Sequence, residues 1–390
     1  MITTLAISGY RSLRDVTVAL EPLNVVTGAN GTGKSSLYRA LRLLADIAQG
    51  QVVRALAHEG GLDSTLWAGP EKVSRAMKAG DRPVQGTIRA EGVSLKLGFA
   101  TDDYGYAIDL GLPPPDSRPP PMGSKFTKDP QIKVESLWVG QVLRPRNEIA
   151  ARRGPSVRVR ADGGTWTQAL TSLSAFDSMM THASDPHNAV ELLRLRDAMR
   201  GWRFYDHFAT DREAASRRPQ IGTYTPVLAS DGSDMAAAMQ TIIEVGQVED
   251  FNDAVSDAFP NSSVEIEGEN GFFQFQMRQH GLLRPLKAAE LSDGTLRYLL
   301  LMTALLSPRP PAFMVLNEPE MSLHPDLLPA LGRLIAKASE TSQIVVVSHS
   351  HELVAAIEAA KATKRVTLEK QLGETHIVDN DPPPWEWPSR

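Results

Sequence analysis

The chain has 390 residues, 42% hydrophobic and 22% charged, with a formal net charge of −5 and no cysteine. This composition is typical of a globular protein, and it excludes disulfides, thiolate metal sites and a surface that binds nucleic acid throughout. Residues 1–5 lack the basic start of a signal peptide, and no apolar run is long enough to cross a bilayer. We therefore expect a cytoplasmic protein with no membrane partner.

The first predicted element is a short hairpin, whose strands are residues 5–7 and 16–18. An apolar run over 23–27 then predicts a strand. Apolar residues at helical spacing over 36–48 predict a helix, and its continuation to residue 57 is left open.

Between this strand and this helix lies the sequence GANGTGKS, which matches the phosphate-binding P-loop pattern. Its glycines let backbone N–H groups close around phosphates, and the helix N-terminus adds the positive end of its dipole. Lys34 is expected to reach the β- and γ-phosphates, and the Ser35 hydroxyl to bind magnesium. A chance glycine turn is the alternative, but the flanking strand and helix disfavour it. The residues expected to bind ATP here are Gly28, Ala29, Asn30, Gly31, Thr32, Gly33, Lys34, Ser35 and Ser36.

After residue 85 the hydrophobic pattern changes to a period of two, which predicts an antiparallel meander. A proline-rich segment over 113–121 is predicted to be an exposed loop. The predicted strands are residues 86–91, 93–98, 107–110, 132–142 and 157–160.

The most basic stretch of the chain follows, and we see only Glu148 there to offset its charge. It reads equally well as a solvated hairpin and as a contact for the phosphate backbone of DNA. Its arginines are Arg144, Arg146, Arg152, Arg153, Arg158 and Arg160.

The pattern over 167–247 is mainly helical, and a second hairpin is predicted at 264–277. Short buried strands and helices then alternate, which predicts a parallel sheet with right-handed crossovers. Residues 382–387, rich in proline, are expected to form a loose tail. The alternating elements are helices at 296–306, 327–338 and 351–360 and strands at 312–316 and 343–347.

Four short motifs accompany these elements in a fixed order, namely LSDGT at 291–295, NEPE at 317–320, SLHP at 322–325 and VSHS at 347–350. Together with the P-loop and GYRS at 9–12, this set resembles the ABC-type ATPase heads of the SMC/RecF/OLD-like branch of AAA-family ATPases. The resemblance covers 1–50 and 286–360 well and the middle only loosely. No heptad pattern for a coiled coil and no second, nuclease domain is seen.

The resemblance implies roles for several side chains. Glu318 would polarise the attacking water or take its proton, with His349 on the γ-phosphate and Lys34 as the third catalytic residue. Ser292 and Gly294 would grip the ATP held by a second subunit, so a homodimer is expected when ATP is bound. Arg11 of the GYRS motif is expected at the nucleotide. A helix-entry role for Glu318 and a metal pair of His349 with His351 are the alternatives.

Asn317 departs from the family pattern, because an acidic residue usually faces the magnesium ion at this position. An amide can accept a hydrogen bond from metal-bound water, but it brings no charge, so turnover is expected to be slow. The glutamine of the family's Q-loop cannot be assigned, and Gln141 and Gln168 are both candidates.

The predicted fold class is α/β: a P-loop NTPase of the ABC/SMC-like ATPase-head type, with a mixed sheet, an antiparallel β insertion and a helical lid. The predicted segments are an N-terminal lobe with the P-loop (1–83), a β-rich insertion (84–165), a helical lid region with a hairpin (166–285), a C-terminal ATPase lobe (286–378) and a tail (379–390).

The leading functional hypothesis is an ATP- and Mg²⁺-dependent switch that dimerises on ATP and hydrolyses it. By family analogy its partner is DNA or a nuclease, in DNA repair or anti-phage defence. The rival hypothesis is a slow or inactive ATPase that acts as a nucleotide-sensing scaffold for a nuclease or another partner.

Overall fold

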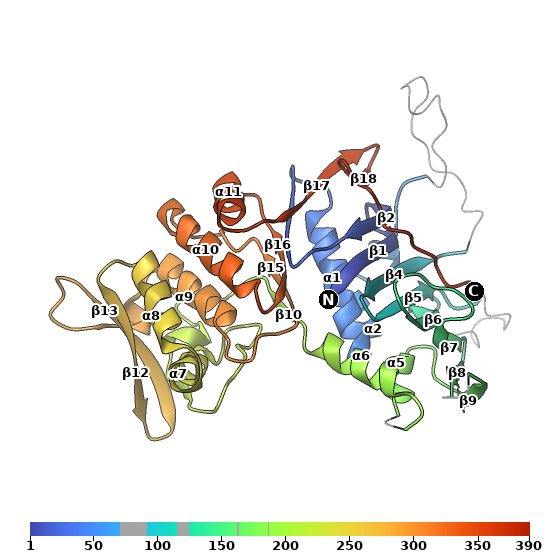
Figure 1. The fold of residues 1–390 in the computed structure, drawn as a ribbon, viewed down its shortest axis with the longest axis horizontal. Helices are drawn as coiled ribbons and strands as arrows, with labels where there is room; N and C mark the ends of the chain where they lie inside the picture. Colours follow the sequence, from blue (N-terminus) through green and yellow to red (C-terminus); the bar gives the residue numbers. More distant parts are fainter. Residues whose placement is uncertain (71–91, 115–124, 162–163, 186) are drawn as a thin grey trace. The chain divides into compact units, whose positions relative to one another are not determined.

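A computed structural model of the chain describes residues 1–70, 92–114, 125–161, 164–185 and 187–390. The predicted strand at 86–91 and most of the proline-rich segment lie outside the described residues. The fold forms two compact units (Figure 1). The first unit comprises Met1–Leu20, Gly28–Gly201 and Val366–Arg390, and the second comprises Glu21–Thr27 and Trp202–Arg365. The boundaries of the five predicted segments stay predictions.

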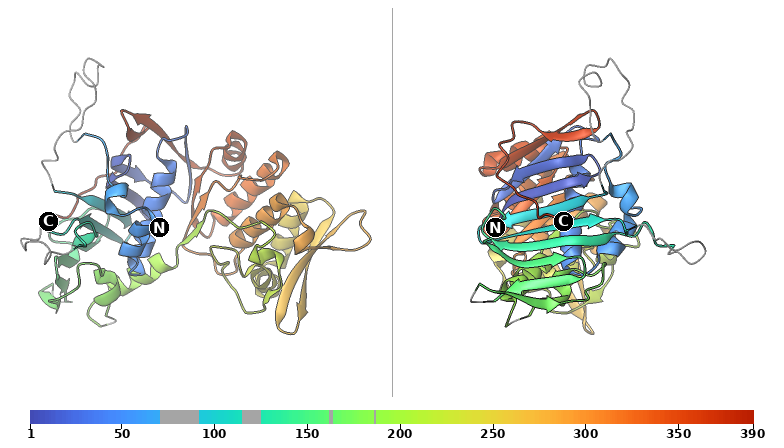
Figure 2. Two further views of the ribbon diagram at one scale, coloured as in Figure 1. Left: turned by 180° about the vertical axis from the view of Figure 1, so that it is seen from behind. Right: turned by 90° about the vertical axis from the view of Figure 1, so that its right-hand side faces the viewer.

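In the residues that the structure describes, the first unit is built on an eight-stranded sheet in the order β2-β1-β4-β5-β6-β7-β8-β9. Figure 2, in its right-hand view, shows these strands side by side. Every neighbouring pair is antiparallel, so the predicted N-terminal hairpin and the described part of the predicted meander are confirmed. The strands are β1 (Ile2–Tyr10), β2 (Leu13–Ala19), β4 (Leu95–Thr101), β5 (Tyr104–Gly111), β6 (Gln131–Val139), β7 (Glu148–Arg153), β8 (Ser156–Arg160) and β9 (Trp166–Leu170).

Helix α1 (Lys34–Ala48) follows the P-loop and buries its apolar side, including Leu37, Leu41 and Leu44. Burying each such leucine stabilises the fold by about 1.5–3 kcal/mol. The sequence left open whether this helix continues to residue 57, and it does not. Gly50 has φ 75°, so α2 (Val52–His58) is a separate helix. The other helices among the described residues of this unit are α3 (Leu62–Thr65), α5 (Met179–His182) and α6 (Val190–Arg200), which packs on α1.

Two predictions for the first unit are wrong. Residues of β9 were expected to be helical, but they form a strand that pairs with β8 at the edge of the sheet. Trp166, at the start of β9, stacks on the guanidinium groups of Arg158 and Arg160. The C-terminal tail is not loose, because the Trp385 ring packs edge-on against Trp138 with ring centroids 5.4 Å apart.

Arg390 anchors the same tail. Its Nε donates a hydrogen bond of 2.6 Å to Oδ2 of Asp109, whose side chain is 1% exposed. A buried carboxylate requires a partner, and the tail supplies it.

The second unit contains four parallel strands in the order β10-β15-β16-β3. They are β10 (Arg203–Tyr205), β15 (Phe313–Asn317), β16 (Gln343–Val347) and β3 (Leu23–Gly28), which pairs with β16 through residues 23–26. The central strands β15 and β16 are continuous apolar runs, as expected for parallel strands buried on both faces. The predicted parallel sheet is confirmed.

Helices α9 (Asp293–Leu305), α10 (Leu328–Ala338) and α11 (His351–Ala360) accompany these strands, and α10 packs on both of the others. Their apolar faces form one hydrophobic core with the strands and with α7 (Met235–Val245) and α8 (Val248–Ala258). The turns η1 (Ala215–Arg217), η2 (Ala288–Glu290) and η3 (Pro325–Leu327) connect elements of this unit.

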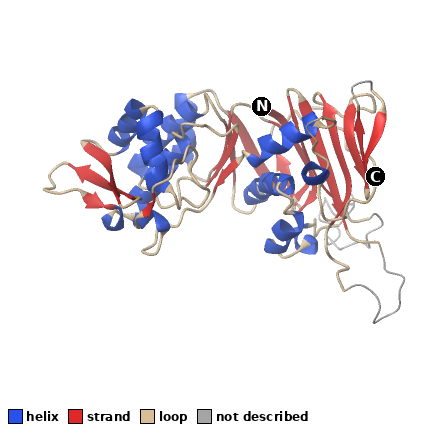
Figure 3. Cartoon of the chain, turned by 90° about the horizontal axis from the view of Figure 1, so that it is seen from below, coloured by secondary structure: helices blue, strands red, loops and turns tan. Residues whose placement is uncertain are grey.

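The second predicted hairpin is confirmed as β12 (Ser262–Glu269) paired with β13 (Phe272–Gln279). The short strands β11 (Gln220–Ile221) and β14 (Leu286–Lys287) also pair with β13. Figure 3 shows the helices of this unit gathered beside the hairpin. Residues 368–371 of β17 (Lys364–Gln371) pair in the first unit with β18 (Glu374–Ile377), which lies beside β2.

Among the described residues, no helix combines the length and the hydropathy that a bilayer span requires.

Candidate nucleotide-binding site

The P-loop of the first unit has backbone conformations that only glycine adopts freely. Gly28 has φ 143° and Gly33 has φ 109°. A Cβ atom on Gly28 would lie 2.3 Å from the Leu368 carbonyl oxygen, and one on Gly33 would lie 2.5 Å from Oγ1 of Thr375. The conformation and the packing therefore both require glycine at these two positions.

Lys34 and the start of α1 complete this loop. The Lys34 side chain is buried, and its Nζ donates to the carbonyl oxygens of Gly28 at 2.5 Å and Ala29 at 2.8 Å. Gly33 caps the 15-residue helix α1 and gives no side-chain capping bond. The first N–H groups of the helix are thus directed into the loop, as phosphate binding at a helix N-terminus requires.

A support for the P-loop comes from the far end of the chain, and sequence reasoning missed it. Thr375 of β18 is 2% exposed, and its Oγ1 donates to the Thr32 carbonyl oxygen at 2.6 Å. Its backbone N–H donates to the Ser12 carbonyl oxygen at 2.8 Å. The loop is therefore held between β18 and the β1–β2 turn. No sequence pattern marks Thr375, because a single threonine in a strand is common.

Arg11, predicted at the nucleotide, is engaged elsewhere in this structure. Its guanidinium forms an ion pair of 2.7 Å with Glu59, which also accepts a hydrogen bond from the Tyr10 hydroxyl. Burial is the largest single influence and lowers the pKa of Arg11, but the interactions with Glu59 and Tyr10 together outweigh it and the pKa is raised. Burial and the Glu59 carboxylate also raise the pKa of Tyr10. Nucleotide binding by Arg11 stays a prediction.

In the second unit, the predicted catalytic residues follow the carboxyl ends of neighbouring parallel strands. Asn317 ends β15 opposite Val347, the last residue of β16. The Glu318 N–H donates to the Val347 carbonyl oxygen at 2.8 Å, and the Ser348 N–H donates to that of Val26 in β3 at 3.1 Å. The NEPE and VSHS motifs therefore share the carboxyl edge of this sheet, the edge at which α/β folds bind ligands.

Glu318 and His349 contact each other at this edge. Oε1 of Glu318 lies 3.2 Å from Nε2 of His349. Glu318 has φ 47°, a left-handed conformation that costs a non-glycine residue about 1–3 kcal/mol and is commonest at functional sites. The structure therefore brings these two predicted residues together.

Glu320 fixes the loop that carries His349. Its Oε1 accepts hydrogen bonds from the Ser348 hydroxyl at 2.8 Å and from the backbone N–H groups of His349 at 2.7 Å and Ser350 at 3.1 Å. The second acid of NEPE is thus a positioning residue, a role that the sequence alone did not indicate.

Asn317 has a carboxylate partner on the neighbouring strand. Its Nδ2 donates a hydrogen bond of 2.7 Å to Oδ1 of Asp206, directly after β10. Its Oδ1 is buried and has no hydrogen-bond partner among the described residues. Arg297 lies behind this pair and donates to the carbonyl oxygens of Asp206 at 3.2 Å and Glu318 at 3.3 Å. Burial lowers the pKa of Arg297, while the carboxylates of Asp206, Glu320 and Glu318 oppose the shift.

The LSDGT motif starts helix α9. Ser292 is the N-cap and accepts a hydrogen bond of 3.1 Å from the Thr295 N–H. Gly294 lies against the SLHP motif, where a Cβ atom would be 2.8 Å from the Ser322 carbonyl oxygen. This close approach requires glycine at position 294.

Arg217 holds the segment that leads into LSDGT. Its guanidinium donates to the carbonyl oxygens of Ala288 at 3.1 Å and Leu291 at 2.8 Å and to the Asp293 carboxylate at 2.6 Å. The residue is 8% exposed. Arg217 lies 75 positions before Ser292, so sequence reasoning could not connect the two.

Neither candidate for the Q-loop glutamine lies in the four-stranded parallel sheet. Gln141 follows β6, and Gln168 lies in β9, where its Nε2 donates to the Val157 carbonyl oxygen at 2.9 Å. Across the described parts of the chain, no group of three or more histidine or acidic side chains forms a metal cage.

The basic stretch includes one arginine that cannot reach a ligand. Arg152 is 0% exposed and forms an ion pair of 3.1 Å with the equally buried Glu135. Glu135 therefore offsets part of the positive charge of this stretch, in addition to Glu148. Removing Arg152 would leave the buried Glu135 carboxylate without its oppositely charged partner, which costs about 3–5 kcal/mol. The prediction that Arg152 contacts DNA is therefore wrong, whereas Arg144, Arg146 and Arg158 are exposed.

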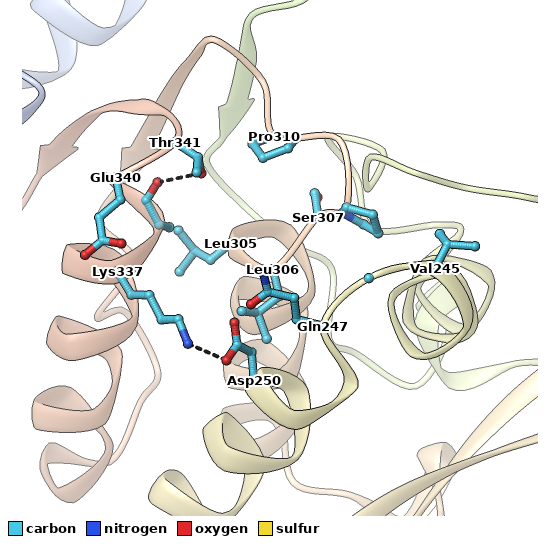
Figure 4. A pocket seen from close by; sticks show the side chains of 13 residues that line it. Val245, Gln247, Asp250, Leu305, Leu306, Ser307, Pro310, Lys337, Glu340 and Thr341 are labelled. Carbon is cyan, nitrogen blue, oxygen red and sulfur yellow. Dashed lines mark hydrogen bonds and ion pairs between the residues drawn. The ribbon is translucent and has the colours of Figure 1, made fainter.

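A separate pocket of about 420 Å³ lies in the second unit, between the ends of α7, α8, α9 and α10 (Figure 4). Pro310 and Thr341, which line it, precede β15 and β16. The pocket is thus near the amino ends of these strands, away from Glu318 and His349. An ion pair of 2.6 Å between Lys337 and Asp250 spans part of its wall.

Comparisons with known proteins agree with this geometry. A family model with the description "AAA domain, putative AbiEii toxin, Type IV TA system" matches residues 23–355. The comparison with curated proteins gave no match. The crystal structure of an Smc head bound to the C-winged helix domain of ScpA is similar in fold, with 13% identity, a TM-score of 0.51 and 97% of each chain covered.

Two further SMC heads cover 97% of this chain. One, from Thermotoga maritima, is 17% identical with a TM-score of 0.46 and 98% of its own chain covered. The other, from Pyrococcus furiosus and bound to the C-terminal domain of ScpA, is 12% identical with a TM-score of 0.48 and 95% covered. The predicted fold class and the resemblance to ABC/SMC-like ATPase heads are confirmed. The SMC heads share its fold, and the chain belongs to the AAA-domain family whose model it matches.

Proposed function

We propose that this chain is a molecular switch that binds ATP with Mg²⁺, dimerises around it and separates when it is hydrolysed. The observation that carries the proposal is the contact of 3.2 Å between Glu318 and His349 at the carboxyl edge of the parallel sheet. The contact supports the proposal, because a carboxylate beside an imidazole N–H suits a general base and a hydrogen-bond donor.

The P-loop holds the nucleotide in this proposal. Residues 28–36 supply backbone N–H groups, and Lys34 moves its ammonium group from the loop carbonyls to the β- and γ-phosphates. Ser35 and Asn317 are the residues for the magnesium ion, which neutralises phosphate charge when bound. The buried Oδ1 of Asn317, which has no partner in the described part of the chain, fits such a role, because an amide oxygen accepts hydrogen bonds from metal-bound water.

Glu318 and His349 act at the γ-phosphate end. The carboxylate orients the attacking water and accepts its proton, and the imidazole N–H donates to a γ-phosphate oxygen. Glu320 holds the backbone of His349 in place through its hydrogen bond of 2.7 Å.

Dimerisation is proposed because each nucleotide site would combine the P-loop of one copy with the LSDGT motif of another. The chain has one P-loop and one LSDGT motif, so by family analogy Ser292 and Gly294 of one copy complete the site of the other. Arg217 supports this proposal, because it fixes the entry to Ser292 through Leu291 and Asp293.

The pathway is proposed from the family. Its description names a toxin of a type IV TA system, which favours a defence role over DNA repair. The partner is DNA or a nuclease, in the cytoplasm. A DNA contact is supported by the exposed Arg144, Arg146 and Arg158 of the first unit.

The alternative is a nucleotide-sensing scaffold that hydrolyses ATP slowly or not at all. Asn317 favours it, because the amide brings no negative charge to the metal side of the site.

Phosphate release under steady-state conditions tests the proposal. The wild type should release phosphate with Mg²⁺ and ATP, and Glu318→Gln should lower the rate about 100-fold or more, since it removes the base. Lys34→Ala, measured at an ATP concentration too low for it to bind, gives the baseline rate. A wild-type rate equal to this baseline, with ATP bound, would leave only the scaffold.

A further inference from the structure

The pairing of Asp206 with Asn317 follows from strand register. Tyr205 of β10 lies opposite Leu316 of β15 in a parallel pair. The next residues, Asp206 and Asn317, therefore leave the sheet side by side at its carboxyl edge. Their side chains meet through the hydrogen bond of 2.7 Å from Nδ2 to Oδ1.

This bond determines how the Asn317 amide is oriented. Because Nδ2 donates to the Asp206 carboxylate, Oδ1 is the atom left for another partner. Oδ1 is buried and unpaired among the described residues, and a buried acceptor without a partner is unfavourable. The arrangement therefore points to a donor or a cation that is bound in the working protein.

The pair is also held firmly. Arg297 is 2% exposed and donates to the carbonyl oxygens of both Asp206 and Glu318. One guanidinium thus fixes the backbone at the ends of β10 and β15. The carboxylate of Asp206 is partly exposed, so it can reach solvent or a bound ion.

We propose that Asp206 supplies the negative charge that Asn317 lacks, and that the two side chains together form the metal-facing pair for the Mg²⁺ of bound ATP. Asn317 offers its amide oxygen, and Asp206 offers a negatively charged carboxylate. Mg²⁺ and its bound water prefer oxygen atoms of both kinds as partners. This inference rests on the proposed function. It implies that the acidic residue that the family usually has at position 317 is replaced in this chain by Asp206, which follows the neighbouring strand β10.

A charge-swap experiment tests this. The variants are Asp206→Asn, the double variant Asp206→Asn with Asn317→Asp, and Asp211→Asn as a control with the same charge change at an exposed site. Mn²⁺ is titrated into each protein with ATP and followed by electron paramagnetic resonance. Binding of a fluorescent ATP analogue is measured with and without Mg²⁺.

Asp206→Asn should weaken Mn²⁺ binding in the ATP complex about 10- to 100-fold, the range for partners of metal ligands. Metal-free binding of the ATP analogue should be unchanged. The double variant should recover wild-type Mn²⁺ affinity, because it restores one charge and one amide in reversed positions. Asp211→Asn should match the wild type.

Two results would overturn the inference: wild-type Mn²⁺ affinity in Asp206→Asn, or a loss that the double variant does not recover. If Asp206→Asn fails to fold, the double variant carries the test alone, and it must match the wild type. A wild type that binds ATP no better with Mg²⁺ than Lys34→Ala does would instead defeat the proposed function, and the inference with it.

Discussion

Nε2 of His349 lies 3.2 Å from Oε1 of Glu318, and the two side chains are 37% and 32% exposed. The pair joins the ends of β15 and β16, and both side chains can reach a ligand at the sheet edge. A γ-phosphate oxygen would compete with Glu318 for the imidazole N–H. Phosphate binding would then release the carboxylate to accept a proton from water.

His349→Ala should therefore lower kcat for ATP hydrolysis about 100-fold and leave ATP affinity within a few-fold. His351→Ala is the matched control, since His351 is the first residue of α11. Steady-state kinetics and equilibrium ATP binding measure the two effects. Equal losses in both variants would favour the metal pair of His349 with His351.

Lys34→Ala should weaken ATP binding about 10- to 100-fold, because it removes charge-assisted hydrogen bonds to the phosphates. Arg39→Ala changes the same charge on the exposed side of α1 and should bind normally. Isothermal titration calorimetry checks both, and circular dichroism should show that the fold is intact. ATP binding by Lys34→Ala at the wild-type level would mean that the site is misplaced.

The P-loop, the parallel strands and the motif order could be predicted from sequence, because each depends on local patterning. Strand, glycine-rich loop and helix follow one another without interruption at residues 23–48. The contact between Glu318 and His349 could also have been predicted from sequence, because both residues follow strands of one parallel sheet.

The pairing of Asp206 with Asn317 was not predictable. Strand β10 has only three residues, Arg203–Tyr205, and such a short run carries no periodicity. The roles of Arg217 and Thr375 depend on contacts far apart in the sequence. The tail was misjudged because proline suggests disorder, whereas Trp385 packs on the sheet.

Ser292→Arg should bind ATP normally and fail to dimerise, because the added bulk and charge block the cradle for the second subunit's nucleotide. Ser292→Asn is the control, since asparagine keeps the N-cap of α9, whose loss costs about 1 kcal/mol. Multi-angle light scattering with ATP distinguishes them. Dimers of Ser292→Arg would show that the motif lies outside the interface.

DNA binding, if it occurs, should depend on Arg144 and Arg146. Replacing both with Glu should weaken it on the order of tenfold or more and reduce its salt dependence, because two phosphate contacts become repulsions. Arg309→Glu, an exposed charge reversal in the second unit, is the control. Fluorescence anisotropy with duplex DNA, ATP and varied salt measures this. No affinity of the wild type at low salt would leave a nuclease or other protein as the partner.

The most direct test of the switch is the mass of Glu318→Gln in solution with Mg²⁺ and ATP. The variant keeps its nucleotide site but lacks the base, so bound ATP should persist and trap the closed dimer. Light scattering should give twice the monomer mass with ATP and the monomer mass with ADP or after Lys34→Ala is added to the same chain. A Glu318→Gln protein that binds ATP and stays monomeric would contradict the account.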